Sequence, residues 1–101
     1  MHDLSYQFTA PVWVYQGKGA WHFVTLPQTA AAEIRFFNSH AQGFMPIAVI
    51  ATIGNTTWKT SVFPDSKSGS FVLAIKKGVR KAENLREGDM VKLDLQVPIH
   101  G

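Results

Sequence analysis

A strict alternation of apolar and polar residues near the end of the chain places the tightest constraint on its fold. Four apolar residues alternate there with three polar ones: Val91, Leu93, Leu95 and Val97 with Lys92, Asp94 and Gln96. Because successive side chains of a β-strand point to opposite faces, this pattern predicts a strand with one face buried and one in solvent. A half-buried strand has to lie in a sheet, so we expect a mainly β domain.

The first strand is expected to be long. Between residues 4 and 15 the apolar side chains again fall on one face: Leu4, Tyr6, Phe8, Ala10, Val12 and Val14. Pro11 interrupts this run, and because proline has no backbone N–H to donate, the strand should bend there or lie at an edge. Gly17-Lys18-Gly19 predicts a hairpin turn, after which residues 20–26 form the returning strand.

Shorter signals complete the order of elements. Apolar runs and turn residues predict further strands at residues 47–53, 56–63 and 70–75. Apolar residues at helical spacing predict one helix that begins at Pro27 and ends at Gly43, and a second over residues 76–84. Gly78 should limit the second helix to one or two turns, since glycine costs roughly 1 kcal/mol relative to alanine in a helix.

Two parts of the chain repeat the same order of elements. A strand from Phe23, a helix and the strand from Ile47 resemble a strand from Phe71, a helix and the strand from Val91. Two such units predict a closed β-barrel of about six strands with two short helices, built from two pseudo-symmetric halves in one chain. Closure leaves no long open edge. We therefore expect a single domain over residues 1–101 that is monomeric, with a weak dimer through the aromatic end as the alternative.

Composition excludes several classes of protein. The chain has 101 residues, 17% of them charged, and a net charge of +3, which permits an anionic partner without demanding one. It has no cysteine, which excludes disulfides, thiolate metal sites and a cysteine nucleophile. The first residues lack the basic and apolar regions of a signal peptide, and no apolar run approaches the roughly 20 residues that span a bilayer. We expect a cytoplasmic protein.

Several short motifs resemble a known family. They are Trp58-Lys59-Thr60-Ser61-Val62-Phe63-Pro64-Asp65, Phe71-Val72-Leu73, Lys76-Lys77-Gly78-Val79-Arg80-Lys81-Ala82 and Gly88-Asp89, together with Phe8, Gly19-Ala20-Trp21 and Leu26-Pro27. They are similar to a family of small microbial proteins, the domain of unknown function number nineteen-oh-five. The resemblance runs along nearly the whole chain.

The resemblance implies a fold but no established activity. It implies a double-split β-barrel, the fold class of AbrB- and MazE-type DNA-binding proteins. Those proteins pair half-barrels from two chains, whereas here the two halves would be fused. The chain departs from the family at Ala74, where such proteins often have proline after a leucine. Without the fixed φ of proline, the entry into the following helix is less constrained.

The basic run at the second helix is the first candidate site. The cations concerned are Lys76, Lys77, Arg80 and Lys81, with Lys59 on a strand before them. An anion bound at the helix start would meet ammonium groups and backbone N–H groups together. We therefore predict a non-catalytic binding module for a phosphate-bearing or other anionic partner, including nucleic acid. The alternative is a solvated face whose charges only keep the protein soluble.

An aromatic group near the first hairpin is the second candidate site. Trp13, Tyr15 and Trp21 gather there, and aromatic residues dominate the hot spots of protein interfaces. They favour a protein-interaction or accessory domain that docks through this end, although cross-strand pairs that stabilise a hairpin have the same pattern. Trp58 is in phase with the apolar face of its strand, so we expect it in the core.

Catalytic and metal-binding patterns are not visible in the sequence. The histidines are scattered without ligand spacing: His2, His22, His40 and His100. Ser61 lacks the glycine-flanked elbow of a nucleophilic serine. We therefore expect no enzyme activity, no metal, no cofactor and no membrane partner.

Overall fold

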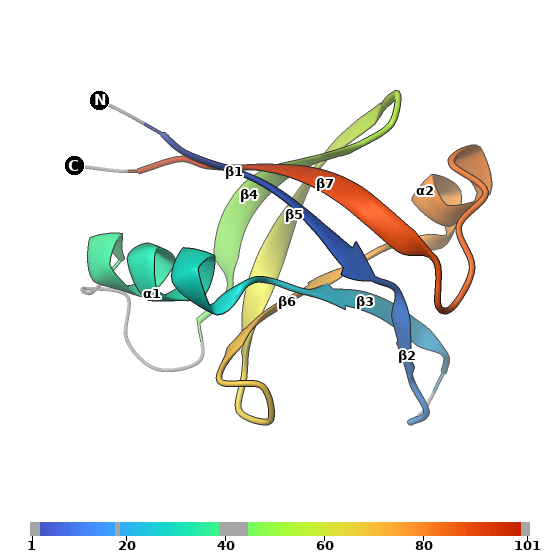
Figure 1. Cartoon of the computed structure of the whole chain (residues 1–101), viewed down its shortest axis with the longest axis horizontal. Helices are drawn as coiled ribbons and strands as arrows, with labels where there is room; N and C mark the ends of the chain where they lie inside the picture. The colour runs from blue at the N-terminus through green and yellow to red at the C-terminus, as the bar shows by residue number, and fades with distance from the viewer. Residues whose placement is uncertain (1–2, 18, 39–44, 100–101) are drawn as a thin grey trace.

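The described part of the protein is a curled antiparallel β-sheet with two short helices (Figure 1). The computed structural model describes residues 3–17, 19–38 and 45–99. In chain order the elements are β1 (Leu4–Pro11), β2 (Trp13–Tyr15), β3 (Trp21–Thr25), α1 (Gln28–Phe37), β4 (Ile47–Ile53), β5 (Thr56–Asp65), β6 (Ser70–Ala74), α2 (Lys77–Ala82) and β7 (Met90–Val97). The prediction of a mainly β domain with two short helices is confirmed.

All seven strands of the described residues lie in one sheet. Its order is β1-β7-β4-β5-β6-β3-β2, and every neighbouring pair is antiparallel. β1 and β2 lie at the two ends of this order, yet Val12 alone separates them in the chain, so the sheet has to curl. Its concave face holds the core, whose largest fully buried side chains include Leu26, Ile34, Leu73, Ile75, Leu93 and Leu95.

The described residues curl into a half-barrel of seven strands, one more than the six or so expected from the sequence, and closure of the barrel stays a prediction. The first long strand is divided at Val12, which adds one strand to the count. The N–H of Val12 donates to the carbonyl of Asp89 at 2.9 Å, and its carbonyl accepts from the N–H of Gly88 at 2.8 Å. β1, which ends at Pro11, lies at one end of the strand order, so the edge position is the one of the two expected outcomes that the structure shows.

The two strand–helix–strand units that the sequence predicts pair with each other. β3 pairs with β6, and β4 pairs with β7. The hairpin of β2 and β3 corresponds in the same way to the hairpin of β5 and β6. Figure 1 shows α1 and α2 on opposite sides of the molecule. This pairing is what two similar halves would give, and their pseudo-symmetry stays a prediction.

Helix α1 begins at Gln28, one residue after the predicted start, because Pro27 is its N-cap; it lies against the sheet through its buried residues Ala30, Ala31 and Ile34. Tyr6 of β1 donates its hydroxyl to Oε1 of Glu33 at 2.6 Å. This bond connects the exposed face of α1 to the first strand. The predicted end of the helix, at Gly43, lies outside the described residues.

Helix α2 has six residues, which confirms the one or two turns expected from Gly78. It ends where Asn84 takes a left-handed conformation, with φ of +55°. The N–H of Leu85 then donates to the carbonyl of Arg80 at 2.8 Å, which is the closing bond of a Schellman motif.

Strand β5 reaches Asp65, two residues beyond its predicted end at Phe63. Asp65 pairs with Ser70, and the N–H of Gly69 donates to the carbonyl of Asp65 at 2.9 Å. Gly69 has φ of +73°, a conformation that glycine adopts without strain. The turn is therefore limited to residues 66–69, and Asp65 belongs to the sheet.

Neither helix of the described chain is long and apolar enough to cross a membrane. The cytoplasmic location expected from the sequence stays a prediction.

Candidate functional site

An apolar hollow of about 400 Å³ lies on the outer face of β2, β3, β6 and β5. Its lining consists of Trp13, Tyr15, Trp21, Phe23, Phe63, Asp65, Val72 and Ala74. We call it the aromatic groove. The three aromatic residues singled out in the sequence all line it, so the structure brings Trp13, Tyr15 and Trp21 together.

Strand register explains why these side chains share one face. Trp13 is opposite Phe23, and Phe23 is opposite Ala74, so these three form one row across the strands. Tyr15 and Trp21 form the row beside it. Because side chains alternate along a strand, the intervening residues point the other way, into the core. Among them Val24, Leu73 and Val62 are completely buried.

Three aromatic rings of the groove, those of Trp13, Phe23 and Trp21, pack against one another. The ring centroids of Trp13 and Phe23 are 5.0 Å apart, and those of Trp21 and Phe23 are 6.2 Å apart with planes only 11° from parallel. The indole N–H of Trp13 donates to Oγ1 of Thr25 at 2.8 Å. Trp21 is nevertheless 55% exposed and Tyr15 52% exposed. Packing across β2 and β3 therefore accounts for Trp13 and Phe23, whereas Trp21 packs along its own strand and keeps half of its surface in solvent.

The groove continues into a polar hollow at the turn between β5 and β6. This second hollow shares Trp13, Tyr15 and Asp65 with the first and adds Thr25, Ser66, Lys67 and Ser68. Oδ2 of Asp65 accepts from the hydroxyl of Ser68 at 2.8 Å and from its N–H at 3.2 Å. The hydroxyl bond is the main reason why the pKa of Asp65 lies below its usual value. Asp65 is therefore ionised at neutral pH.

Helix α1 holds this turn in place. Gln28 donates its side-chain amide to the carbonyl of Ser68 at 2.7 Å, and Arg35 donates to the carbonyl of Gly69. The guanidinium of Arg35 also lies 5.1 Å from the ring centroid of Phe71. These contacts hold the turn of residues 66–69 in one position against α1, so the polar end of the groove has a fixed shape.

The predicted basic site is only partly assembled. Lys76, Lys77 and Lys81 are exposed at α2, whereas Arg80 is half-buried and donates its Nε to the carbonyl of Ile75 at 3.1 Å. Arg80 thus has a structural partner within its own segment. Lys59 lies on another element, β5, opposite Ile50 of β4.

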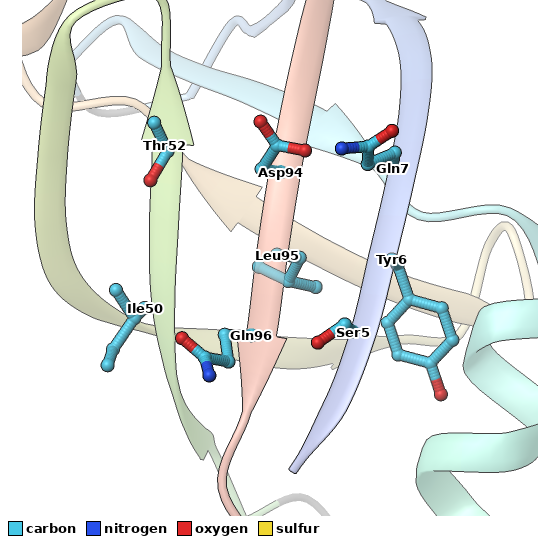
Figure 2. A pocket seen from close by; sticks show the side chains of 8 residues that line it. All are labelled: Ser5, Tyr6, Gln7, Ile50, Thr52, Asp94, Leu95 and Gln96. Atoms are coloured by element: carbon cyan, nitrogen blue, oxygen red, sulfur yellow. The ribbon is translucent and has the colours of Figure 1, made fainter.

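Lys59 adjoins a separate polar hollow of about 290 Å³ on the outer face of β1, β7 and β4. Figure 2 shows Gln7, Asp94 and Thr52 in one row across these strands. The apolar–polar alternation of β7 is enough to explain why polar side chains line this hollow, because it puts them on the solvent-facing side of the strand.

In the described part of the chain no three His, Cys, Asp or Glu residues are grouped so as to hold a metal ion.

Trp58 is 9% exposed and belongs to the core, as its phase in the strand predicts. Five lining residues of the groove were not named as site residues from the sequence: Phe23, Phe63, Asp65, Val72 and Ala74. Phe23 could have been found, since the hairpin turn predicted at residues 17–19 implies the pairing of Phe23 with Trp13 that the strands show; Lys18 itself lies outside the described residues. Phe63 and Asp65 depend on the pairing of β5 with β6 and gave no comparable signal.

These observations define a small, mainly β protein with an exposed aromatic groove. The model of one protein family, described as a domain of unknown function (DUF1905), matches residues 8–95. The chain belongs to this family, and the resemblance seen in its motifs is confirmed. A search of the curated proteins found no match.

Proposed function

We propose that this protein is a non-catalytic interaction module that docks an extended segment of a partner protein in the aromatic groove. The observation that carries the proposal is the exposure of Trp21, Tyr15 and Phe63, which are 55%, 52% and 43% exposed on one hollowed face. Large aromatic side chains on a concave surface supply contact area at a low cost in conformational entropy.

The form of the groove favours an extended segment. It crosses four adjacent strands and has an apolar part and a polar part that share Trp13, Tyr15 and Asp65. The rings of Trp13, Phe23 and Trp21 are already packed against one another, so these three need little ordering when a partner binds.

The basic segment is the second candidate site. Lys76, Lys77 and Lys81 are exposed at one short helix, which favours an anionic partner such as a phosphate-bearing ligand or nucleic acid. Such a partner would bind at α2, because Asp65 would repel phosphates from the groove.

We also propose that the curled sheet closes as a double-split barrel and that the protein is a monomer. The support is the position of β1 and β2 at the two ends of the strand order, joined through Val12. A barrel completed within one chain needs no second copy. Light scattering after size-exclusion chromatography should give the monomer mass over a wide range of concentration, and a dimer at every concentration would contradict this.

The docking proposal is tested by selecting binders from a library of random peptides displayed on phage. The variant Trp21→Ala should lose at least about tenfold in affinity for the selected peptides, as expected for a hot-spot aromatic. The matched control is Phe36→Ala, because Phe36 is 74% exposed on α1 and lies outside the groove lining. Equal losses in both variants, or none in Trp21→Ala, would overturn the proposal.

A further inference from the structure

We infer that the docked segment is a proline-rich stretch in the polyproline II conformation that carries an arginine beside Asp65. This inference rests on the docking function proposed above and specifies the partner.

The aromatic part of the groove suits proline. Proline-rich segments bind in grooves lined with aromatic side chains, and they are extended before binding, which reduces the entropy they lose. Trp21 and Phe23 present nearly parallel rings, 6.2 Å apart between centroids, with Phe63 and Val72 also lining the groove. Flat apolar surfaces of this kind contact the rings of prolines without needing a particular hydrogen bond.

The charge of the groove selects a cation. Among the described residues that line the aromatic groove, Asp65 alone carries a charge. Lys67 lies outside this lining but shares the adjoining hollow with Asp65, and its charge contributes to the lowered pKa of that carboxyl; its side chain is exposed and can turn to solvent when a partner binds. The faces of tryptophan and tyrosine rings attract cations as well. A carboxylate next to such faces therefore favours a positive residue and disfavours a phosphate.

Arginine fits this position better than lysine. Its planar guanidinium stacks on an aromatic ring and donates from a rigid fork to a carboxylate. Ser68 donates two hydrogen bonds to Asp65, both to Oδ2, and a carboxylate offers about four acceptor positions, so acceptor capacity is left for a ligand. Trp13 and Tyr15 line both hollows together with Asp65, which puts aromatic side chains and a carboxylate at the junction.

The width of the groove sets the length of the segment. From β5 to β2 there are three intervals between strands, which is about 14 Å at the usual strand spacing. Polyproline II rises about 3.1 Å per residue, so roughly five residues span the groove. A segment of two or three prolines followed by an arginine matches both of its parts.

Three synthetic peptides of equal length test the inference. The first contains prolines and one arginine, the second replaces the arginine by glutamate, and the third replaces the prolines by alanine and keeps the arginine. Binding to the whole protein is followed by its tryptophan fluorescence and by changes in its NMR chemical shifts. The first peptide should bind best, and Asp65→Asn should weaken it roughly three- to fivefold, as expected for a solvent-exposed ion pair. Asparagine keeps an acceptor for Ser68, so this variant removes the charge and retains the turn.

Other outcomes contradict the inference in separate ways. Equal binding of the first two peptides to wild type, or no effect of Asp65→Asn, would show that the partner's arginine does not contact Asp65. Equal binding of the first and third peptides would overturn the polyproline conformation. If none of the three binds while phage-selected peptides still need Trp21, the docking function stands and this inference falls. If wild type binds single-stranded RNA or associates with itself, and Trp21→Ala loses that property, then RNA or a second copy of the chain is the partner and the inferred peptide is not.

Discussion

Thr56 and Glu83, which are distant in sequence, are joined by a hydrogen bond of 2.6 Å from the Thr56 hydroxyl to Oε2 of Glu83. Thr56 begins β5, and Glu83 is the residue that caps the end of α2. The bond therefore ties the second helix to the hairpin of β4 and β5. Because the acceptor is a carboxylate in a partly buried place, this bond should be stronger than one between neutral groups.

The first prediction concerns this bond. Thr56→Val should lower the free energy of unfolding by about 1–2 kcal/mol, because the part-buried carboxylate loses its donor. Thr9→Val is the matched control, since Thr9 is exposed on β1 and its replacement should change stability by less than about 0.5 kcal/mol. Urea unfolding measures both. If Glu83→Ala is as costly in the Thr56→Val background as in wild type, the two residues are not coupled.

Gly54 gives the second prediction. It has φ of +59°, and a Cβ added there would overlap the carboxylate of Glu83. Alanine in this conformation costs about 1–2 kcal/mol, and displacing Glu83 should break its bond to Thr56 in addition. In a Glu83→Ala background the overlap is absent, so Gly54→Ala should then cost less. Thermal unfolding of the two single variants and the double variant checks this, and strictly additive losses would contradict it.

The third prediction concerns Gly78, where, in contrast to Gly54, a larger residue should stabilise the protein. It lies within α2, and a Cβ added there meets no atom within 4 Å. Gly78→Ala should therefore raise the free energy of unfolding by about 0.5–1 kcal/mol, because alanine loses less backbone entropy in a helix. An increase in the urea midpoint at constant slope is the expected result. A destabilised variant would mean that α2 needs the flexibility of glycine.

Sequence patterns predicted the elements well where the signal was local. The alternation from Val91 to Val97 identified β7, and the turn predicted from Gly17 and Gly19 was enough to place Tyr15 beside Trp21. Both depend only on the two-residue period of a strand and on a short turn. The aromatic cluster could be predicted for the same reason.

Features that depend on long-range pairing could not be predicted. Phe63 and Val72 join the groove because β5, β6 and β3 are neighbours in the sheet, and no local pattern specifies that order. Arg80 has helical spacing to Lys76, so its sequence position suggested a shared basic face. Its half-buried bond to Ile75 arises from the path of the chain between β6 and α2.

The fourth prediction concerns alkaline pH. Burial, the hydrogen bond to Glu33 and the charge of Glu33 raise the pKa of Tyr6 above the ordinary value of 10.0. The unfolded state therefore releases this proton first, so the contribution of Tyr6 to stability is complete below about pH 10 and is lost as the pH rises above it. Tyr6→Phe should be less stable than wild type at neutral pH. The two unfolding free energies should converge above pH 10, and a constant difference would contradict this.

The last prediction separates the cations of the basic segment by role. Arg80→Gln should lower the free energy of unfolding by about 1 kcal/mol, because it removes the donor to the Ile75 carbonyl. Lys76→Gln combined with Lys81→Gln should leave stability unchanged or slightly raised. Lys81 lies four residues from Lys77 on α2, and such pairs repel by roughly 0.2–0.5 kcal/mol on a helix. Lys76 is the N-cap residue, where a cation is unfavourable beside the positive end of the helix dipole.

The same lysine variant tests binding at α2. If α2 binds anions, phosphate or heparin should raise the melting temperature of wild type by mass action, and the lysine double variant should lose most of this shift. Lys92→Gln is the matched control, since Lys92 is an exposed cation on β7, and it should retain the shift. A wild type that shows no shift, or a double variant that keeps all of it, would leave the exposed lysines as a solvating surface. Function would then rest on the aromatic groove alone.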